Sequence, residues 1–128
     1  MMTKLTPDAL EDRLIEFGSA VCVALRRLPK GLIGSHLCRQ LVRSATSPAA
    51  DYAEARGAES RRDFVHNMQL CLKELRESLV WLRLLHRLGG MESAAAVLAA
   101  EYHELIAVFV RSINTAKRPT RRPSRGAD

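Results

Sequence analysis

The chain has 128 residues, 47% of them hydrophobic and only 5% aromatic, and a net charge of +6. One hydrophobic core serves roughly 100–200 residues, so this length predicts a single domain, and the few aromatic residues favour helices packed through aliphatic side chains. Three separated cysteines argue against a disulfide framework or a zinc ribbon. Charged residues interrupt the N-terminal segment before any apolar run, so we expect no signal peptide, no membrane span and a cytoplasmic protein.

The first predicted helix covers residues 7–28. Thr6 is a suitable N-cap, Pro7 fits the first helical position, and Asp8 places an acid in the first turn. Apolar residues then recur at spacings of three and four, which is the period of one helix face. The breaker Pro29-Lys30-Gly31 ends this helix.

The second predicted helix covers residues 35–56, and Pro48 lies inside its apolar stripe. Proline lacks a backbone donor and clashes with the preceding turn. We therefore expect a kink near Pro48, with the hydroxyl of Thr46 or Ser47 bonding to the carbonyl that the proline leaves free. A break into two helices at Ser47 is the alternative.

The third predicted helix, residues 60–88, starts from Ser60 as N-cap and ends at Gly89-Gly90, residues that accept left-handed backbone angles. The fourth, residues 91–116, begins with a run of alanines. Short connections favour antiparallel neighbours, so the pattern predicts an all-α, up-down-up-down four-helix bundle in residues 1–116. Residues 117–128, rich in arginine and proline, predict a disordered basic tail.

Helix 60–88 is apolar on more than one side near its end. Trp81 and Leu84 lie off the main stripe and would form an exposed apolar patch on a single chain. We therefore expect a homo-oligomer with these two residues at its interface. The alternative is that a tilted first or fourth helix covers them.

Three segments resemble one bacterial protein family: residues 39–55, a middle part with Asp63-Phe64, Glu74, Glu77 and residues 81–85, and residues 109–118. This is the four-helix-bundle family whose founding members are encoded in ribosomal-RNA intervening sequences, and the resemblance covers nearly the whole chain. The family usually has asparagine where this chain has Asp51, which weakens any role that needs an amide donor there.

This resemblance implies a closed ring of subunits, commonly five, with no known catalytic activity. A more distant relative is the accessory variability determinant of diversity-generating retroelements, a basic pentameric bundle that partners a reverse transcriptase and RNA. The number five comes from the resemblance alone.

Two sets of cations are candidates for nucleic-acid binding. Lys73, Arg76, Arg83 and Arg87 share one face of helix 60–88, with Val80 between them, and such a strip suits backbone phosphates. A solvated helix face is the alternative reading. The second set is in the tail and consists of Lys117, Arg118, Arg121, Arg122 and Arg125. The alternative for this set is a terminus that only increases solubility. No aromatic residue lies among these charges, so base stacking and sequence-specific reading are not indicated.

Arg43, Glu54, Glu74 and Glu77 are predicted to form a polar network that fixes the register of neighbouring helices. Neither Glu74 nor Glu77 begins the Glu-x-x-His motif of di-iron bundles. His36 and Cys38 supply only two of the four ligands that zinc needs. We therefore expect no metal, no cofactor and no catalytic residue.

The sequence thus predicts a non-enzymatic, ring-forming helical bundle that binds nucleic acid, RNA before DNA, through backbone phosphates. The alternative is a protein–protein scaffold or accessory subunit, for example of a retroelement reverse transcriptase. The expected partners are further copies of the chain and a nucleic acid, without a membrane.

Overall fold

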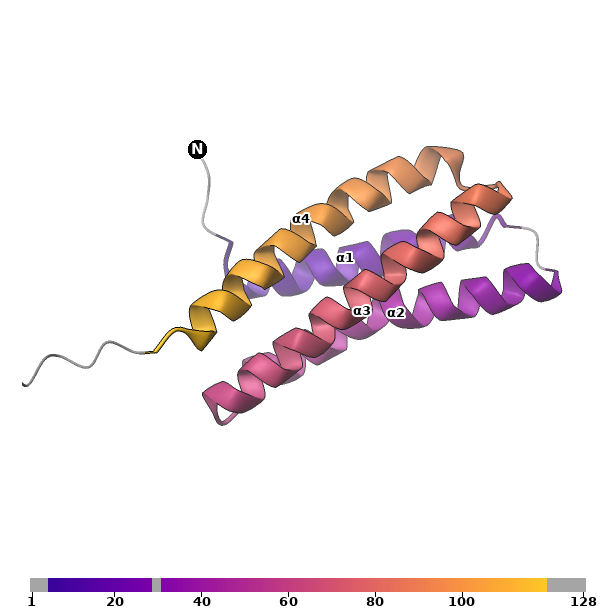
Figure 1. Ribbon diagram of the computed structural model, residues 1–128. Coiled ribbons are helices and arrows are strands. Elements are labelled where there is room, and N and C mark those ends of the chain that lie inside the picture. Colours follow the sequence, from indigo (N-terminus) through magenta and orange to yellow (C-terminus); the bar gives the residue numbers. More distant parts are fainter. Residues whose placement is uncertain (1–4, 29–30, 120–128) are drawn as a thin grey trace, which may run out of the picture.

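The structure, a computed structural model, describes residues 5–28 and 31–119. It contains four helices and, within those ranges, no strand: α1 (Pro7–Leu25), α2 (Leu32–Arg56), α3 (Arg61–Leu88) and α4 (Glu92–Lys117). Figure 1 shows the three connections at alternating ends of the helices, so that each helix returns alongside the one before it. The predicted all-α four-helix bundle is confirmed.

The helix ends follow the predicted capping chemistry. The hydroxyl of Thr6 accepts from the amide of Ala9 at 3.1 Å, and the hydroxyl of Ser60 accepts from the amide of Asp63 at 3.1 Å. Gly89 and Gly90 follow α3 with φ of 93° and 105°, which only glycine adopts without strain. These caps place the helix starts where the sequence puts them.

Two boundaries around the first connection differ from the prediction. Helix α1 ends at Leu25 rather than Leu28, although Leu28 remains buried in the core. Helix α2 begins at Leu32 rather than Ser35, because Gly31 in extended conformation acts as the N-cap and its carbonyl accepts from the amide of Ser35 at 2.8 Å. A glycine N-cap carries no side-chain signal, so the sequence did not reveal it.

Helix α2 continues through Pro48, so the alternative of two separate helices is wrong. The kink at Pro48 stays a prediction. Pro48 leaves the carbonyl of Ser44 without its helical donor, but the neighbouring hydroxyls bond elsewhere. Thr46 donates to Val42 O at 2.7 Å and Ser47 donates to Arg43 O at 2.6 Å. The expected rescue of the freed carbonyl is therefore wrong.

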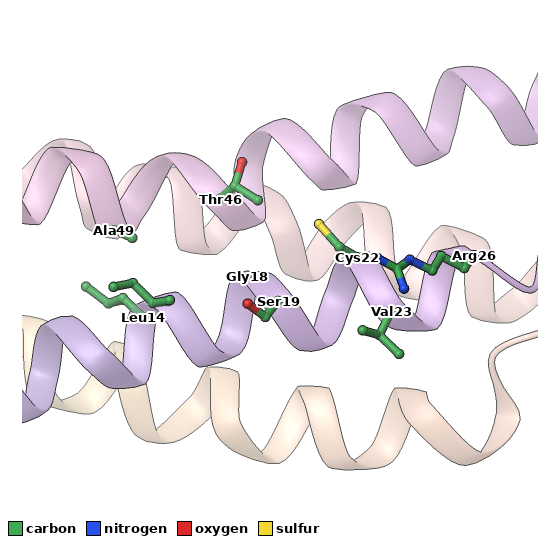
Figure 2. Close-up of a pocket in the computed structure, with 9 residues that line it drawn as sticks. Leu14, Gly18, Ser19, Cys22, Val23, Arg26, Thr46 and Ala49 are labelled. Atoms are coloured by element: carbon green, nitrogen blue, oxygen red, sulfur yellow. The ribbon is translucent and has the colours of Figure 1, made fainter.

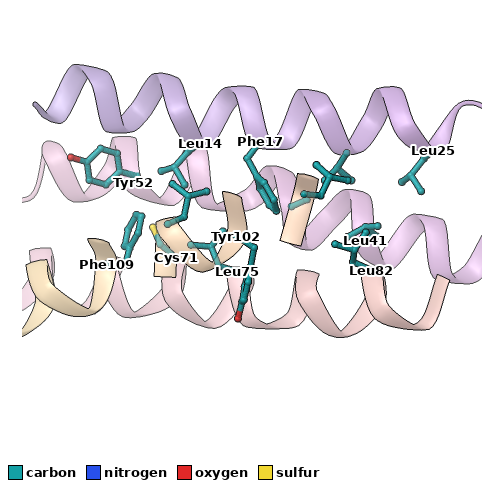
Figure 3. Packing of buried hydrophobic residues seen from close by; sticks show 14 of the residues in the cluster. Leu14, Phe17, Leu25, Leu41, Tyr52, Cys71, Leu75, Leu82, Tyr102 and Phe109 are labelled. Carbon is teal, nitrogen blue, oxygen red and sulfur yellow. The ribbon is translucent and has the colours of Figure 1, made fainter. Parts of the chain in front are cut away.

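The core is one cluster that runs the length of the bundle, with every helix contributing one apolar stripe (Figure 3). In one of its layers, Phe109 is fully buried and meets Tyr52 edge to face, with ring centroids 5.8 Å apart. Among the residues that the structure describes, the buried polar side chains Ser44 and Ser78 donate to carbonyls of their own helices, Gln40 O at 2.9 Å and Leu75 O at 2.7 Å. Burial of both hydroxyls therefore leaves no lost hydrogen bond.

Helix α4 is, in the described part of the chain, the one helix long and apolar enough to cross a membrane by length and composition, with a hydropathy of 1.4 over its most apolar window. Its apolar character comes from a buried stripe that includes Leu98, Leu105 and Phe109 and from the alanines that precede it. A helix that supplies the core of a bundle passes the same test.

Replacing Phe109 by alanine removes a fully buried ring and the edge contact with Tyr52. We expect a loss of about 3–5 kcal/mol in the free energy of unfolding, measured by urea denaturation at fixed protein concentration. Val97→Ala is the matched control, because Val97 is 69% exposed, and should stay within about 0.5 kcal/mol of the parent. Equal losses in both variants would contradict the described core.

Candidate functional site

Three arginines each bind two carboxylates across the line of contact between neighbouring helices; we call these groups the arginine clamps. Arg13 of α1 binds Glu101 at 2.8 Å and Glu104 at 2.6 Å, both on α4. Arg56 of α2 binds Asp8 at 2.7 Å and Glu11 at 3.3 Å, both on α1. Arg43 of α2 binds Glu74 at 3.2 Å and Glu77 at 2.7 Å, both on α3. The clamps therefore tie three of the helix pairs together.

The Arg43 clamp contains three of the four residues predicted as a polar network. Gln40 also accepts from Arg43, at 3.4 Å. Glu54 lies exposed and forms no ion pair among the described residues, so its membership of the network is wrong. The network is only partly buried, because the Arg43 side chain is 50% exposed. An exposed pair of this kind contributes little stability.

Two carboxylates in the contact between α2 and α3, those of Asp51 and Glu74, have pKa values raised by burial. Burial raises the pKa of Asp51, and the charge of Glu54 raises it further. Burial likewise raises the pKa of Glu74, with Glu77 adding to the effect and Arg43 opposing it. Both groups are therefore easier to protonate in the folded chain than in the unfolded one.

The same contact contains Cys71, which is fully buried. Its thiol donates to the carbonyl of Pro48, with a sulfur–oxygen distance of 3.4 Å. Burial raises the pKa of Cys71 to about 12, so the group stays a thiol at neutral pH. Cys71 is therefore a packing residue.

The predicted phosphate-binding cations lie together on the outside of α3; we call Lys73, Arg76, Arg83 and Arg87 the α3 strip. All four are exposed, and none forms an ion pair within the ranges that the structure describes. Val80, 52% exposed, lies between them. Two of the three acids of the same helix, Glu74 and Glu77, turn toward α2 and are held by Arg43, and the third, Asp63, lies in its first turn. The strip therefore keeps its charge.

The two arginines at the start of α3, whose direction the sequence leaves open, differ. Arg61 donates to the carbonyl of Arg118 at 3.4 Å and so lies against the end of α4. Arg62 is exposed and is available to extend the strip.

The predicted tail is only partly within the described residues. Lys117 is the last residue of α4, and Arg118, its C-cap, is exposed. Arg121, Arg122 and Arg125 lie outside the described residues, so their predicted role and the predicted disorder of the tail are not examined by the structure.

Trp81 is half-buried, contrary to the expected exposed patch. Its ring packs against the core and meets the ring of His36 edge-on, with centroids 6.2 Å apart, so α2 rather than α1 or α4 covers it. The indole nitrogen is buried and has no acceptor in the described part of the chain. Leu84 is 40% exposed, as expected, and Leu88 beyond it is more exposed still. The apolar surface therefore centres on Leu84 rather than on Trp81.

His36 is thus a packing partner of Trp81, and no group of three or more metal-ligating side chains occurs among the described residues. Cys38 is buried between α1 and α2.

A second basic surface lies where α1 ends and α2 begins, and the sequence reasoning above missed it. Arg26, Arg27 and Arg39 are exposed there and form no ion pair in the described ranges. The signal was present, because the chain has no acidic residue from Phe17 to Ala50. Arginine spacing within one helix does not reveal this surface, because residues of two helices form it.

Comparison with known proteins gives a family and similar solved structures, one of which is described below. The sequence model of one family, the 23S rRNA-intervening sequence proteins, matches residues 12–111. A crystal structure of a protein of unknown function from the S23 ribosomal protein family of Bacteroides thetaiotaomicron is similar, with a TM-score of 0.72 and 26% identity. The similarity covers 84% of this chain and 97% of that one. Among curated proteins, none is similar to this chain.

Replacing Asp51 by asparagine should stabilise the fold at neutral pH. The folded-state pKa of Asp51 is raised, so its ionised form weakens folding at pH values above that pKa. The gain should disappear as the pH falls below the unfolded-state value near 3.8, where aspartic acid is protonated in both states. Urea denaturation of both proteins across this range measures it.

Glu59→Gln, an exposed change in the connection between α2 and α3, is the control and should show neither effect. An Asp51→Asn variant that is less stable than the parent at pH 7 would mean that the carboxylate has a partner the structure does not give it.

Proposed function

The chain belongs to the 23S rRNA-intervening sequence protein family, and from this premise we propose that it is a non-enzymatic helical bundle that binds nucleic acid, RNA before DNA, through backbone phosphates. The observation that carries the proposal is the α3 strip, four exposed cations that pair with no carboxylate of residues 5–28 and 31–119. Cations in this state gain most from a phosphate, because no ion pair has to be broken first.

The arginine clamps make the rest of the chain more positively charged. Three of the twenty cationic side chains hold six of the fourteen carboxylates. The other seventeen cations and eight carboxylates carry a net charge of +9, while the three clamps carry −3, which together give the +6 of the chain. A polyanion is the partner that such a surface attracts.

The shape of the α3 strip fits a phosphate backbone better than it fits a base. Lys73 and Arg87 are about 21 Å apart along the helix axis, given a rise of about 1.5 Å per residue. The strip therefore offers several contacts in a row. It carries no aromatic ring, so it supports binding without sequence reading.

Self-association is part of the proposal. Leu84 and Leu88 each follow an arginine of the strip by one residue, which rotates them by about 100° around the helix. Contacts fix the two sides: Trp81 meets His36 of α2, while Arg83 lines a hollow with Ala95 and Ala99 of α4. Leu84 lines one hollow with Arg83 and Arg87, so an interface at Leu84 would border the strip, whose Lys73 and Arg76 lie outside that hollow. A ring would repeat the strip in every subunit; five subunits come only from resemblance.

A protein–protein scaffold is the second candidate, for example an accessory subunit of a reverse transcriptase. The exposed apolar residues beside the strip, Val80, Leu84 and Leu88, favour it, because surfaces of this kind also bind other proteins. A reverse transcriptase gene beside the gene for this chain would support this role, and a ribosomal-RNA insertion the other. Residence in the cytoplasm remains part of both proposals.

Replacing all four strip residues by glutamine should weaken binding to single-stranded RNA roughly tenfold or more and flatten its salt dependence. The slope of log K against log salt should become shallower by up to about 3, because each phosphate contact on a single strand contributes about 0.7. Fluorescence anisotropy at several salt concentrations measures both quantities, with the full chain and with residues 117–128 removed.

Single changes provide the matched control for this assay. Arg83→Gln and Arg111→Gln remove the same charge, but Arg111 lies exposed on α4, away from the strip. Only Arg83→Gln should weaken binding clearly. Salt-insensitive binding, or equal effects of both changes, would refute phosphate binding by the strip.

Leu84→Glu should convert the oligomer into a monomer of 14.3 kDa, because a carboxylate cannot be buried in an apolar interface without a partner. Light scattering on nuclease-treated protein gives the mass. Val97→Glu makes the same change on the exposed face of α4 and should leave the mass unchanged. A parent protein that is already monomeric at high concentration rules out the ring.

A further inference from the structure

Two adjoining hollows lie between α1 and α2, on the side of the bundle that the α3 strip does not occupy; we call them the α1–α2 groove. One has a volume of about 390 Å³ and the other about 560 Å³. Cys22 and Arg26 line both, so the hollows are continuous. Figure 2 shows Cys22 pointing from α1 toward α2, with the Arg26 side chain running along α1 beside it. A volume of this order is typical of small-molecule sites, which span about 300–1,000 Å³.

The groove exists because this helix pair carries small side chains where it meets. At Gly18 the helices are so close that a Cβ atom would lie 3.1 Å from the carbonyl oxygen of Ala45. Toward the end of α1, the facing residues Cys22, Ser35 and Cys38 leave the larger hollow unfilled. Its floor is apolar, because Leu25 and Cys38 are buried there.

The rim of the larger hollow is cationic. Arg26 and Arg39 line it, are exposed, and form no ion pair with any residue that the structure describes. Arg43 lines it as well, but its guanidinium is already held by Glu74 and Glu77. With no acid between Phe17 and Ala50, nothing on these segments neutralises the rim.

We propose that the larger hollow is a subsite for one unpaired nucleotide of a single-stranded RNA, with its base on the apolar floor and its phosphates on Arg26 and Arg39. This inference rests on the proposed nucleic-acid binding and specifies what the chain would prefer to bind. Unstacked bases need a flat, partly apolar surface, and guanidinium planes stack on them readily. A base inside a duplex is already stacked and paired, so it cannot enter such a hollow.

Charge complementarity selects this occupant over a second copy of the chain. The rim needs an anion, and a second copy could offer only an exposed carboxylate such as Asp12 or Glu16, which brings no flat ring for the apolar floor. A nucleotide supplies both required parts at once, a phosphate for the rim and an apolar ring for the floor. The α3 strip supplies only the first, so the groove adds a preference for unpaired RNA.

The test follows Cys22, which lies in the groove and is half-buried. The full-length protein is treated with iodoacetamide, and alkylation of Cys22 is measured by peptide mass spectrometry. The probes are a single-stranded RNA of roughly 12 nucleotides, the matching duplex, and an abasic strand with the same number of phosphates. We expect only the single strand to slow alkylation of Cys22, and the abasic strand to bind about tenfold more weakly because base contacts are lost.

Matched variants locate the effect. Arg39→Gln removes a rim cation and should reduce both the affinity for the single strand and the protection of Cys22. Arg111→Gln removes the same charge from an exposed position on α4 that lines neither hollow of the groove, and should leave the protection unchanged.

The outcomes are distinguishable. Salt-dependent RNA binding that needs the α3 strip but leaves Cys22 unprotected, with equal affinity for the abasic strand, overturns the subsite and leaves the proposed function standing. Absence of RNA binding overturns both. Equal protection by polyglutamate, or protection that rises with protein concentration without RNA, assigns the groove to an acidic protein segment or to a second copy, and also overturns the subsite.

Discussion

The arginine clamps are the interaction on which the surface of this bundle depends. Each clamp gathers two carboxylates around one arginine at a helix contact, although Asp8 and Glu104 remain largely exposed there. Because acids are gathered in pairs and arginines singly, the surface away from the clamps is more basic than the composition suggests. The stability of the bundle comes from its apolar core, since partly exposed ion pairs contribute little. The clamps therefore matter more for where charge remains than for how strongly the chain folds.

The positions of the remaining cations explain why there are two separate basic surfaces, one on α3 and one at the corner of α1 and α2. On α3, the acids turn toward α2 and the cations of the strip turn outward. At the corner of α1 and α2, residues 17–50 contain no acid, and Arg26 and Arg39 form no ion pair with a described residue beside a hollow that small side chains leave open. The strip suits a phosphate backbone and the groove suits an unpaired nucleotide. A single strand of RNA is a ligand that fits both kinds of surface.

The fold was largely predictable from the sequence, because four stripes with helical spacing and two side-chain caps, at Thr6 and Ser60, carry their own signals. The start of α2 was not, because a glycine N-cap has no side chain to recognise. Glu74 and Glu77 were correctly placed beside Arg43, since their spacing puts both on one face. Glu54 was wrongly added, because helical spacing does not tell which side of α2 faces α3. Trp81 was misjudged for the same reason, and the groove between α1 and α2 depends on packing that no single helix reveals.

The central claim is that unpaired cations on α3 and at the α1–α2 corner meet a nucleic-acid backbone. The most direct measurement is a map of the residues that crosslink to RNA under ultraviolet light, read by mass spectrometry. The account predicts crosslinked peptides from the α3 strip and from the segment that spans Cys22 to Arg43, with none from the alanine-rich face of α4. Crosslinks confined to α4, or spread evenly over the surface, would contradict it.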